Sequence, residues 1–445
     1  MRSEFVSFRR EYDIKRAMTQ PRLAILGGIR TPFVKSGDAF KDVPAYDLAR
    51  LAMREALDRT GVRPEQVDEV IFGNVAQPAE AANVARVSAL LAGLPIRTPA
   101  VTVHRNCASG MESVTTAYDR LLAGHGKLML AGGTENMSQI PLLYPQSFSE
   151  KLVALQRARK LGARLSALAT FRPKDFSPRI GLILGLTDPI CGLGMGQTAE
   201  VLAKKFKISR YEQDVFALKS HQKAVAARAR LAEEIMPVIT PRLAVTQDIG
   251  PRENQSLEAL EKLKAVFDRK FGTVTPGNTC PVTDGAAALL VCLEQDVKSF
   301  DLPERPLGYL RAYAYAGCPP AQMGIGPVFA TVKMLRRASV PMKEIDLFEI
   351  NEAFACQVLS CLKLFGSANL RKEYGLDGED LLSEIDPSRL NVNGGAIALG
   401  HPVGTSGARL ILTLLKEMQR RGAVRGLATL CVGGGQGAAL LLEAQ

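Results

Sequence analysis

Residues 101–111 read VTVHRNCASGM, an apolar, β-branched run that ends in a polar turn. The run from Pro99 to Val103 has the composition of a buried strand, and a helix-compatible run begins near Ser109. Cys107 therefore lies where a strand passes into a helix. The N–H groups at a helix start lack partners in their own helix and carry a positive partial charge, which favours a thiolate. The position predicts a lowered pKa and a nucleophilic Cys107. The alternative is a small buried residue that fills a tight corner.

The composition is that of a folded α/β protein with two or three domains, since the 445 residues are 47% hydrophobic and 23% charged. A net charge of +11 is compatible with nucleic acid, an anionic membrane or a polyanionic small molecule as a partner. The sequence has no zinc-ligand spacing and no basic stretch interleaved with aromatics, so we expect neither metal nor nucleic acid. Eight cysteines without C-x-x-C spacing favour free thiols in the reducing cytoplasm.

Short apolar runs alternate with helical patterns in the first third of the chain. This alternation predicts a parallel sheet that is covered on both faces. The expected strands are residues 22–28, 67–72 and 127–131, and the expected helices are residues 47–60 and 83–92.

The second half of the chain repeats this plan. Residues 64–74 resemble residues 341–351 in their apolar pattern, and Ala108-Ser109-Gly110 has a counterpart in Thr405-Ser406-Gly407. Two such halves indicate a duplicated α/β domain. Equivalent strand ends from the two halves would then meet in one crevice beyond the sheet.

A basic segment separates the two halves. Residues 150–170 predict one amphipathic helix that could lie on an anionic membrane or dock a partner; an ordinary solvated helix is the alternative. The expected organisation is a disordered basic extension (1–20), an N-terminal half (21–140 plus 271–297), an inserted loop domain (141–270) and a C-terminal half (298–445).

Three further sites carry residues suited to acid–base or oxyanion chemistry. His401 lies in a stretch, residues 391–407, whose many glycines indicate close backbone approach. Cys431 begins a glycine run whose N–H groups could face an oxyanion. Asn351 follows an expected strand, where a side-chain amide can hold a water or an oxyanion.

Taken together, these residues resemble the thiolase family of acetyl-CoA acyltransferases. The resemblance implies two βαβαβαββ halves in a five-layer αβαβα arrangement with an inserted loop domain. The basic insertion before Met195 resembles that of the thiolase subunit of fatty-acid-oxidation trifunctional complexes, where it contacts the membrane or the partner subunit. The resemblance covers residue 22 to the end, and the matching motifs are Asn106-Cys107-Ala108-Ser109-Gly110-Met111, Gly132-Gly133-Thr134-Glu135-Asn136-Met137-Ser138, Asn351-Glu352-Ala353-Phe354, Gly400-His401-Pro402 and Cys431-Val432-Gly433-Gly434-Gly435.

The resemblance implies an enzyme of fatty acid β-oxidation that cleaves 3-oxoacyl-CoA with CoA. His401 would take the proton of Cys107, which attacks the 3-keto carbonyl and carries the acyl group. Cys431 would protonate the acetyl-CoA enolate and then activate free CoA. One oxyanion would be held by the N–H groups of Cys107 and Gly433, and the other by His401 and a water on Asn351. No cofactor or metal is implied, because CoA is a substrate.

The alternative activity is an acetyl-CoA acetyltransferase that condenses two acetyl-CoA molecules. A ketoacyl synthase would need a second catalytic histidine where Asn351 or Cys431 stands.

The resemblance also implies a homodimer or tetramer, with a hydratase/dehydrogenase subunit and an anionic membrane (through residues 150–180) as further candidate partners. The stretch Asn278-Thr279-Cys280-Pro281 departs from the common Asn-Ala-Ser-Gly by carrying a thiol. The residues implied to contact substrate or CoA are Met195, Arg252, Thr279, Cys280 and Phe354.

Overall fold

The strands at the centre of the molecule are buried on both faces. In β5 (Leu128–Glu135), Met129 and Ala131 belong to one core, whereas Leu128 and Leu130 belong to another. Successive side chains of a strand point to opposite faces, so the sheet is covered on both sides. This burial explains why the strands read as continuous apolar runs without alternation.

The computed structural model describes residues 21–376 and 378–444, and the extension expected at residues 1–20 lies outside them. Ten strands form one sheet in the order β12-β13-β14-β11-β1-β10-β5-β3-β4, with β2 paired to β10. Besides β5, these are β1 (Leu23–Arg30), β2 (Val34–Lys35), β3 (Glu69–Gly73), β4 (Ala100–Val103), β10 (Thr283–Leu293), β11 (Gly308–Gly317), β12 (Leu347–Ile350), β13 (Arg425–Val432) and β14 (Gln436–Glu443).

The two ends of this sheet follow the same pairing pattern. In the first half, β3 is parallel to β4 and β5, and β10 is antiparallel to β5 and β1. In the second half, β12 is parallel to β13, and β14 is antiparallel to β13 and β11. The counterpart of β4 in the second half is a single bridge between Phe348 and Leu390. The halves join where Leu23, Ala24 and Ile25 of β1 pair with β11. The sheet is therefore mixed, and the parallel sheet expected from the sequence is wrong for β1, β10, β11 and β14, which pair antiparallel with their neighbours.

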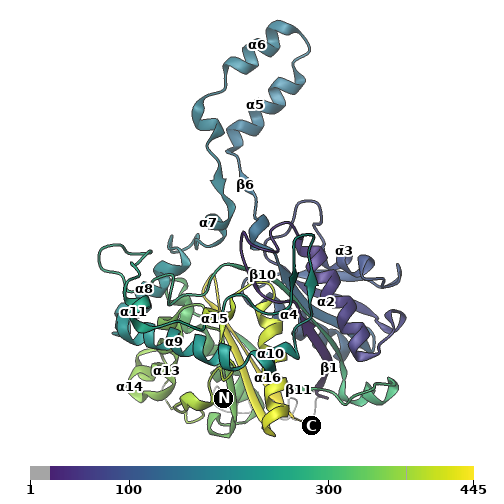
Figure 1. Cartoon of the computed structure of the whole chain (residues 1–445), viewed down its shortest axis with the longest axis vertical. Coiled ribbons are helices and arrows are strands. Elements are labelled where there is room, and N and C mark those ends of the chain that lie inside the picture. Colours follow the sequence, from purple (N-terminus) through teal and green to yellow (C-terminus); the bar gives the residue numbers. More distant parts are fainter. Residues whose placement is uncertain (1–20, 377, 445) are drawn as a thin grey trace, which may run out of the picture.

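The helices complete a five-layer arrangement, as expected for the family. The helices α4 (Ser109–Leu122) and α16 (Ser406–Arg421) lie in the middle, where both contribute to a core shared with strands of both halves. The outer face of the first half is covered by α2 (Ala45–Thr60) and α3 (Val84–Leu91). The outer face of the second half is covered by α12 (Gly326–Ala338) and α13 (Ala355–Gly366). In Figure 1, α13 lies on the opposite side of the molecule from α2 and α3.

The two central helices meet backbone to backbone at their first turns. A Cβ atom added at Gly110 of α4 would lie 2.7 Å from the Ala408 nitrogen, and one added at Gly407 of α16 would lie 2.3 Å from the Met111 nitrogen. Real Cβ atoms do not approach other atoms so closely, and therefore only glycine fits at both positions. The counterparts recognised in the sequence, Ser109-Gly110 and Ser406-Gly407, are thus in direct contact.

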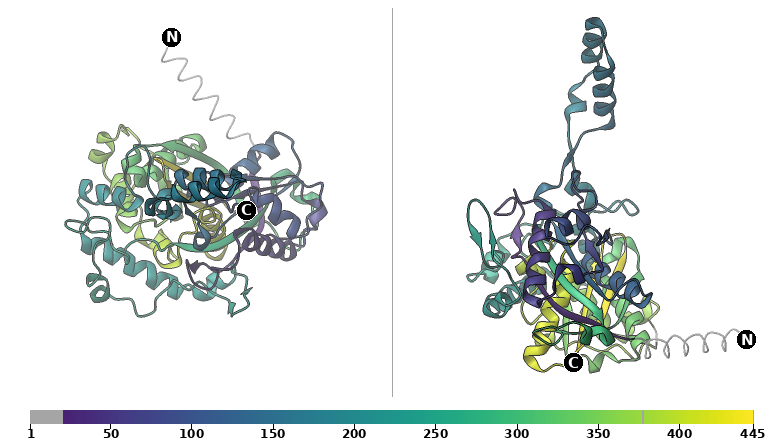
Figure 2. Two further views of the ribbon diagram at one scale, coloured as in Figure 1. Left: turned by 90° about the horizontal axis from the view of Figure 1, so that it is seen from above. Right: turned by 90° about the vertical axis from the view of Figure 1, so that its right-hand side faces the viewer.

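An arm, residues 140–187, stands clear of the body of the molecule (Figures 1 and 2). The single helix expected at residues 150–170 is wrong, because the arm holds two helices, α5 (Gln146–Arg157) and α6 (Leu161–Ala169), that fold back on each other. The turn begins at Ala158, where the backbone becomes extended (ψ 110°).

Aromatic side chains and one ion pair hold the base of the arm together. The Phe148 ring lies 5.8 Å from the Phe171 ring and 5.4 Å from the Phe176 ring, between centroids. The buried Asp175 carboxylate accepts hydrogen bonds from Lys151 Nζ (2.5 Å) and Ser147 Oγ (2.7 Å). These contacts join α5 to the segment that follows α6. They can form only because the two helices run antiparallel to each other.

The remaining elements are short or belong to the insertion. Within the described ranges, no helix combines the length and apolar character needed to cross a bilayer. The other helices and strands are β6 (Leu142–Leu143), β7 (Arg179–Ile180), α7 (Gly181–Gly185), α8 (Met195–Lys205), α9 (Arg210–Ala226), α10 (Arg228–Ala232), β8 (Val238–Ile239), β9 (Ala244–Val245), α11 (Leu257–Glu261), α14 (Ala368–Glu373) and α15 (Ala396–Leu399). Short 3₁₀ helices lie at Pro64–Gln66, Met137–Gln139, Pro173–Phe176, Glu294–Ser299, Pro320–Ile325, Met342–Glu344 and Pro387–Arg389.

The contact between α4 and α16 leads to a stability prediction. Replacing Gly407 with alanine forces the helices apart, so we expect the free energy of unfolding to fall by roughly 1–3 kcal/mol. The matched control is Gly162→Ala in α6, where an added Cβ meets nothing within 4 Å. Circular dichroism during guanidinium unfolding measures both variants, and an equal midpoint for the two would contradict the close contact.

Candidate active site

Cys107 lies in the tight turn between β4 and α4, as the sequence predicted. Asn106 adopts a left-handed conformation (φ 44°), which asparagine tolerates better than most residues. The Ser109 hydroxyl accepts a hydrogen bond from the Arg105 nitrogen (2.9 Å) and donates one to the Asn106 oxygen (2.7 Å). The Asn106 amide also donates to the Gly433 oxygen (2.7 Å). The nucleophile loop is therefore fixed both by its own helix and by the other half of the molecule.

The expected lowering of the Cys107 pKa is wrong in direction. Burial raises the pKa of the Cys107 thiol, because a thiolate is poorly solvated there. The N–H groups of Gly433 and of Cys107 itself act in the opposite sense, and the negative charge of Glu135 adds to the increase. The N–H donors at the helix start are present as the sequence indicated, but their lowering effect on the pKa is smaller than the increase caused by desolvation. Cys107 thus needs a base to remove its proton.

His401 is buried and positioned by both of its ring nitrogens. It follows Gly400, whose φ of 109° is a conformation that favours glycine. Its Nδ1 lies 2.6 Å from Ser406 Oγ, and its Nε2 lies 3.5 Å from Asn351 Nδ2. Burial, with a further contribution from the Arg409 charge, lowers the pKa of His401 to about 3. The imidazole is therefore neutral at physiological pH and able to accept a proton.

The loop after β12 connects Asn351 to the segment that carries His401. Asn351 is fully buried, and its Oδ1 has no protein partner in the described part of the chain. The neighbouring Glu352 carboxylate accepts hydrogen bonds from Ser220 Oγ (2.6 Å), Asn391 Nδ2 (2.8 Å) and the Ile397 nitrogen (3.3 Å). Glu352 thereby ties this loop to the residues on the N-terminal side of His401.

Cys431 and the glycine run complete the group of candidate residues. Cys431 is 1% exposed, and burial together with the nearby Cys107 thiol raises its pKa well above the usual value. Gly434 (φ 89°) and Gly435 (φ 80°) turn the chain immediately after β13. The Gly433 N–H after this strand is close enough to the Cys107 sulfur to act on its pKa in the lowering direction. Cys107, Cys431 and Gly433 thus lie together, and Asn351 lies beside His401, whose loop is held to the first half by the hydrogen bond from the Gly404 nitrogen to Glu135.

Four of the five residues expected to contact substrate lie around this group. Thr279 forms a bridge with Phe354. Burial raises the pKa of the Cys280 thiol, and the charge of the nearby Cys107 adds to the increase. Met195 Sδ lies 3.4 Å from the position of a Cβ added at Gly433. Arg252 is different, because it is exposed and its main-chain nitrogen donates to His221 (3.2 Å).

The structure adds two residues that the sequence did not single out. Phe267 makes an edge-to-face contact with Phe354 (6.2 Å between centroids) and occupies the space that a Cβ of Gly196 would need. Ser406 contacts His401, and the only sequence signal for it was its equivalence to Ser109. The sequence could not indicate Phe267, because its contacts with Phe354 and Gly196 join segments that are distant in the chain.

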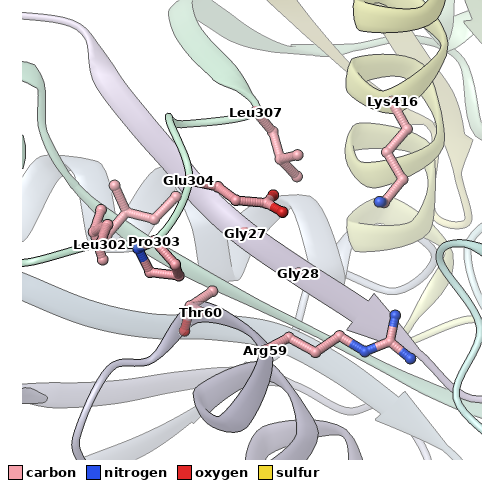
Figure 3. A pocket seen from close by; sticks show the side chains of 10 residues that line it. Gly27, Gly28, Arg59, Thr60, Leu302, Pro303, Glu304, Leu307 and Lys416 are labelled. Carbon is pink, nitrogen blue, oxygen red and sulfur yellow. The ribbon is translucent and has the colours of Figure 1, made fainter.

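A cavity of about 250 Å³ lies at a different place, on β1 between α2 and α16 (Figure 3). None of the candidate catalytic residues contributes to it. Among residues 21–376 and 378–444, no group of three His, Cys, Asp or Glu side chains could hold a metal ion. The cavity is lined by Leu26, Gly27, Gly28, Arg59, Thr60, Leu302, Pro303, Glu304, Leu307 and Lys416.

Comparison with known proteins identifies the family. Residues 23–295 match the model of the thiolase N-terminal domain, and residues 304–444 match that of the thiolase C-terminal domain. The chain belongs to the thiolase family. A 3-ketoacyl-CoA thiolase of Colwellia psychrerythraea is 40% identical over 437 residues, which are 97% of this chain and 99% of the relative. One of Yersinia enterocolitica is 39% identical over 429 residues, or 95% and 97% of the two chains.

Solved thiolase structures share the fold over nearly the whole chain. Human mitochondrial 3-ketoacyl-CoA thiolase in complex with CoA superposes with a TM-score of 0.81 at 36% identity, covering 96% of this thiolase and 98% of the human chain. Bacillus anthracis acetyl-CoA acetyltransferase gives a TM-score of 0.81 at 35% identity, covering 96% and 99%. The thiolase family and fold expected from the sequence motifs are therefore confirmed.

The raised pKa of Cys107 predicts how its alkylation depends on pH. Iodoacetamide reacts with the thiolate, and a pKa raised above the ordinary value of a cysteine means that the thiolate fraction still increases at neutral pH. The alkylation rate of Cys107, measured by peptide mass spectrometry, should therefore rise about tenfold per pH unit between pH 7 and 9. A rate that is already constant at pH 7 would show a preformed thiolate instead.

Proposed function

We propose that this thiolase cleaves 3-oxoacyl-CoA with CoA to acetyl-CoA and a shortened acyl-CoA in fatty acid β-oxidation, through an acyl group on Cys107. The observation that carries the proposal is that Cys107 lies beside Cys431 and Gly433, while Glu135, whose charge acts on Cys107, also binds the loop that carries the neutral His401. The names of the bacterial and human relatives support the same reaction. CoA and acyl-CoA thioesters are the substrates.

In the first step, His401 Nε2 takes the proton of Cys107 while the sulfur attacks the 3-keto carbon. The electron pair of the carbonyl moves to its oxygen. The N–H groups of Cys107 and Gly433, both of which act to lower the pKa of the Cys107 thiol, hold this oxyanion. One such donor typically lowers the barrier by about 3–4 kcal/mol.

In the second step, the oxyanion collapses and the bond between C2 and C3 breaks. The electron pair moves to the acetyl-CoA part as an enolate, whose oxygen is held by His401 and by a water on Asn351. Cys431 gives its proton to the enolate carbon, and acetyl-CoA leaves. The buried, unpartnered Asn351 Oδ1 supports a polar role for this residue in the site.

In the third step, free CoA replaces acetyl-CoA, and the Cys431 thiolate takes the proton of the CoA thiol. The CoA sulfur attacks the acyl carbon on Cys107, whose thiolate leaves and regains a proton from His401. Cys431 and His401 thus end in the states in which they began. Every step is a proton or acyl transfer.

A second candidate is condensation of two acetyl-CoA molecules, the same steps run in reverse on the shortest chain. The observation in its favour is the likeness to the Bacillus anthracis acetyl-CoA acetyltransferase. The arrangement of Cys107, His401 and Cys431 serves both directions.

Thiolysis rates across chain length distinguish the two candidates. We expect this thiolase to consume 3-oxoacyl-CoA substrates of long chain faster than acetoacetyl-CoA, and Cys107→Ala to abolish the reaction on all of them. Cys191→Ala, at a half-buried cysteine of the insertion, is the matched control and should retain activity. Equal or better rates on the four-carbon substrate would favour the acetyltransferase, and no thiolysis at any length would exclude the degradative function.

We also propose that the chain forms a homo-oligomer through the free edge of β4. Among the residues that the structure describes, this strand pairs only with β3, and it is half-buried over its whole length. An unpaired edge of this kind is suited to pairing with a second copy.

The arm is proposed as the docking element for an anionic bilayer, with a hydratase/dehydrogenase subunit as the alternative partner. Its helices expose apolar side chains such as Leu161 (75%) and Leu165 (58%). Exposed cations lie beside them at Arg157, Arg159 and Lys160. An apolar surface bordered by cations is typical of helices that bind lipid headgroups.

Charge reversal tests the membrane proposal. The triple variant Arg157→Glu, Arg159→Glu, Lys160→Glu should lose sedimentation with vesicles containing phosphatidylserine, because each cation near such a surface contributes attraction. The matched control reverses three exposed cations of the body, Lys298, Arg305 and Lys343. Equal binding of the two variants, or no binding of the wild type, would exclude the membrane.

A further inference from the structure

The first residue of each central helix is a serine that bonds to the loop preceding it. Ser109 opens α4 and bonds to Arg105 and Asn106, which flank Cys107 on its N-terminal side. Ser406 opens α16 and contacts His401 and the oxygen of Pro402. The duplication therefore places Ser109 against the loop of the nucleophile and Ser406 against the loop of the base.

The contacts of Ser406 limit where its hydrogen can go. Ser406 Oγ lies 2.6 Å from His401 Nδ1 and 3.1 Å from the Pro402 oxygen. A carbonyl oxygen can only accept, and a serine hydroxyl has one hydrogen with which to donate. When that hydrogen points to Pro402, the hydroxyl oxygen accepts a hydrogen bond from Nδ1–H of His401.

The other ring nitrogen supports the same arrangement. Asn351 Nδ2, a donor, lies 3.5 Å from His401 Nε2. A donor beside Nε2 favours a bare nitrogen there, and a neutral imidazole with a bare Nε2 carries its hydrogen on Nδ1. Ser406 is fully buried, so water does not compete for its hydroxyl.

We propose that Ser406 is a positioning residue that accepts a hydrogen bond from Nδ1–H of His401 and so keeps Nε2 free to take the Cys107 proton. The inference rests on the proposed function, in which His401 is that base. When Nε2 takes the proton, the Cys107 S–H bond breaks and an N–H bond forms. Nδ1–H keeps its bond to Ser406, which therefore needs no rearrangement in either protonation state.

The tautomer of His401 can be read directly in the resting protein. The chain has only four histidines, so ¹⁵N-histidine labelling gives four imidazoles, and His401→Asn identifies the signals of His401. We expect hydrogen on Nδ1 and a bare Nε2 in the wild type. In Ser406→Ala the Nε2–H form should appear. The wild type with hydrogen on Nε2 would overturn the proposal.

Kinetics provide the second readout. Ser406→Ala should lower kcat for thiolysis roughly 10- to 100-fold with KM little changed, because proton transfer is impaired and substrate binding is not. Ser406→Thr retains the hydroxyl and should restore both the tautomer and most of kcat. The matched control is Ser113→Ala, which removes another buried serine that bonds only to main chain, at Gly110 and Gly132.

The outcomes separate this proposal from the proposed function. Unchanged tautomer and kcat in Ser406→Ala would overturn the positioning role, even in an active thiolase. An equal loss of kcat in Ser113→Ala would assign the effect to packing and likewise overturn it. Absence of thiolysis in the wild type would defeat the proposed function, whereas the tautomer measurement would still decide how Ser406 acts on His401.

Discussion

The close approach of α4 and α16 is the constraint on which the site depends. Gly110 and Gly407 let the two helices touch main chain to main chain, and each helix begins a few residues after one reactive group. The placement of the loops that precede these helices is thus constrained by backbone packing in the centre of the molecule, where a methyl group is already too large. Interiors are packed tightly enough to transmit such a constraint.

Buried polar groups fix the loops that carry the chemistry. The Glu135 carboxylate of the first half accepts hydrogen bonds from the Val75 and Ala76 nitrogens, at 3.1 and 2.9 Å, and from the Gly404 nitrogen of the second half at 2.9 Å. Burial raises the pKa of Glu135 to about 7. Asn106 makes the reverse connection, from the nucleophile loop to Gly433. Each half therefore holds a reactive loop of the other, which couples assembly of the site to folding of both.

The sequence predicted those features that follow from local pattern and repetition. Apolar runs indicated the covered sheet, and the repeated Ser-Gly pairs indicated that equivalent loops would meet. The hairpin in the arm was missed because helical periodicity continues on both sides of the turn at Ala158. The direction of the Cys107 pKa was missed because local sequence reveals the donors at a helix start but not how strongly the folded site disfavours a thiolate by desolvation. Phe267 acts through contacts with distant segments, which no local pattern indicates.

The central claim is that the duplicated halves build one site in which Cys107 carries the acyl group. The most direct test is peptide mass spectrometry of the full chain after incubation with a 3-oxoacyl-CoA and no free CoA. The account predicts the mass of the shortened acyl group on Cys107 and its disappearance when CoA is added. No adduct, or an adduct on Cys431 or Cys280 in place of Cys107, would contradict it.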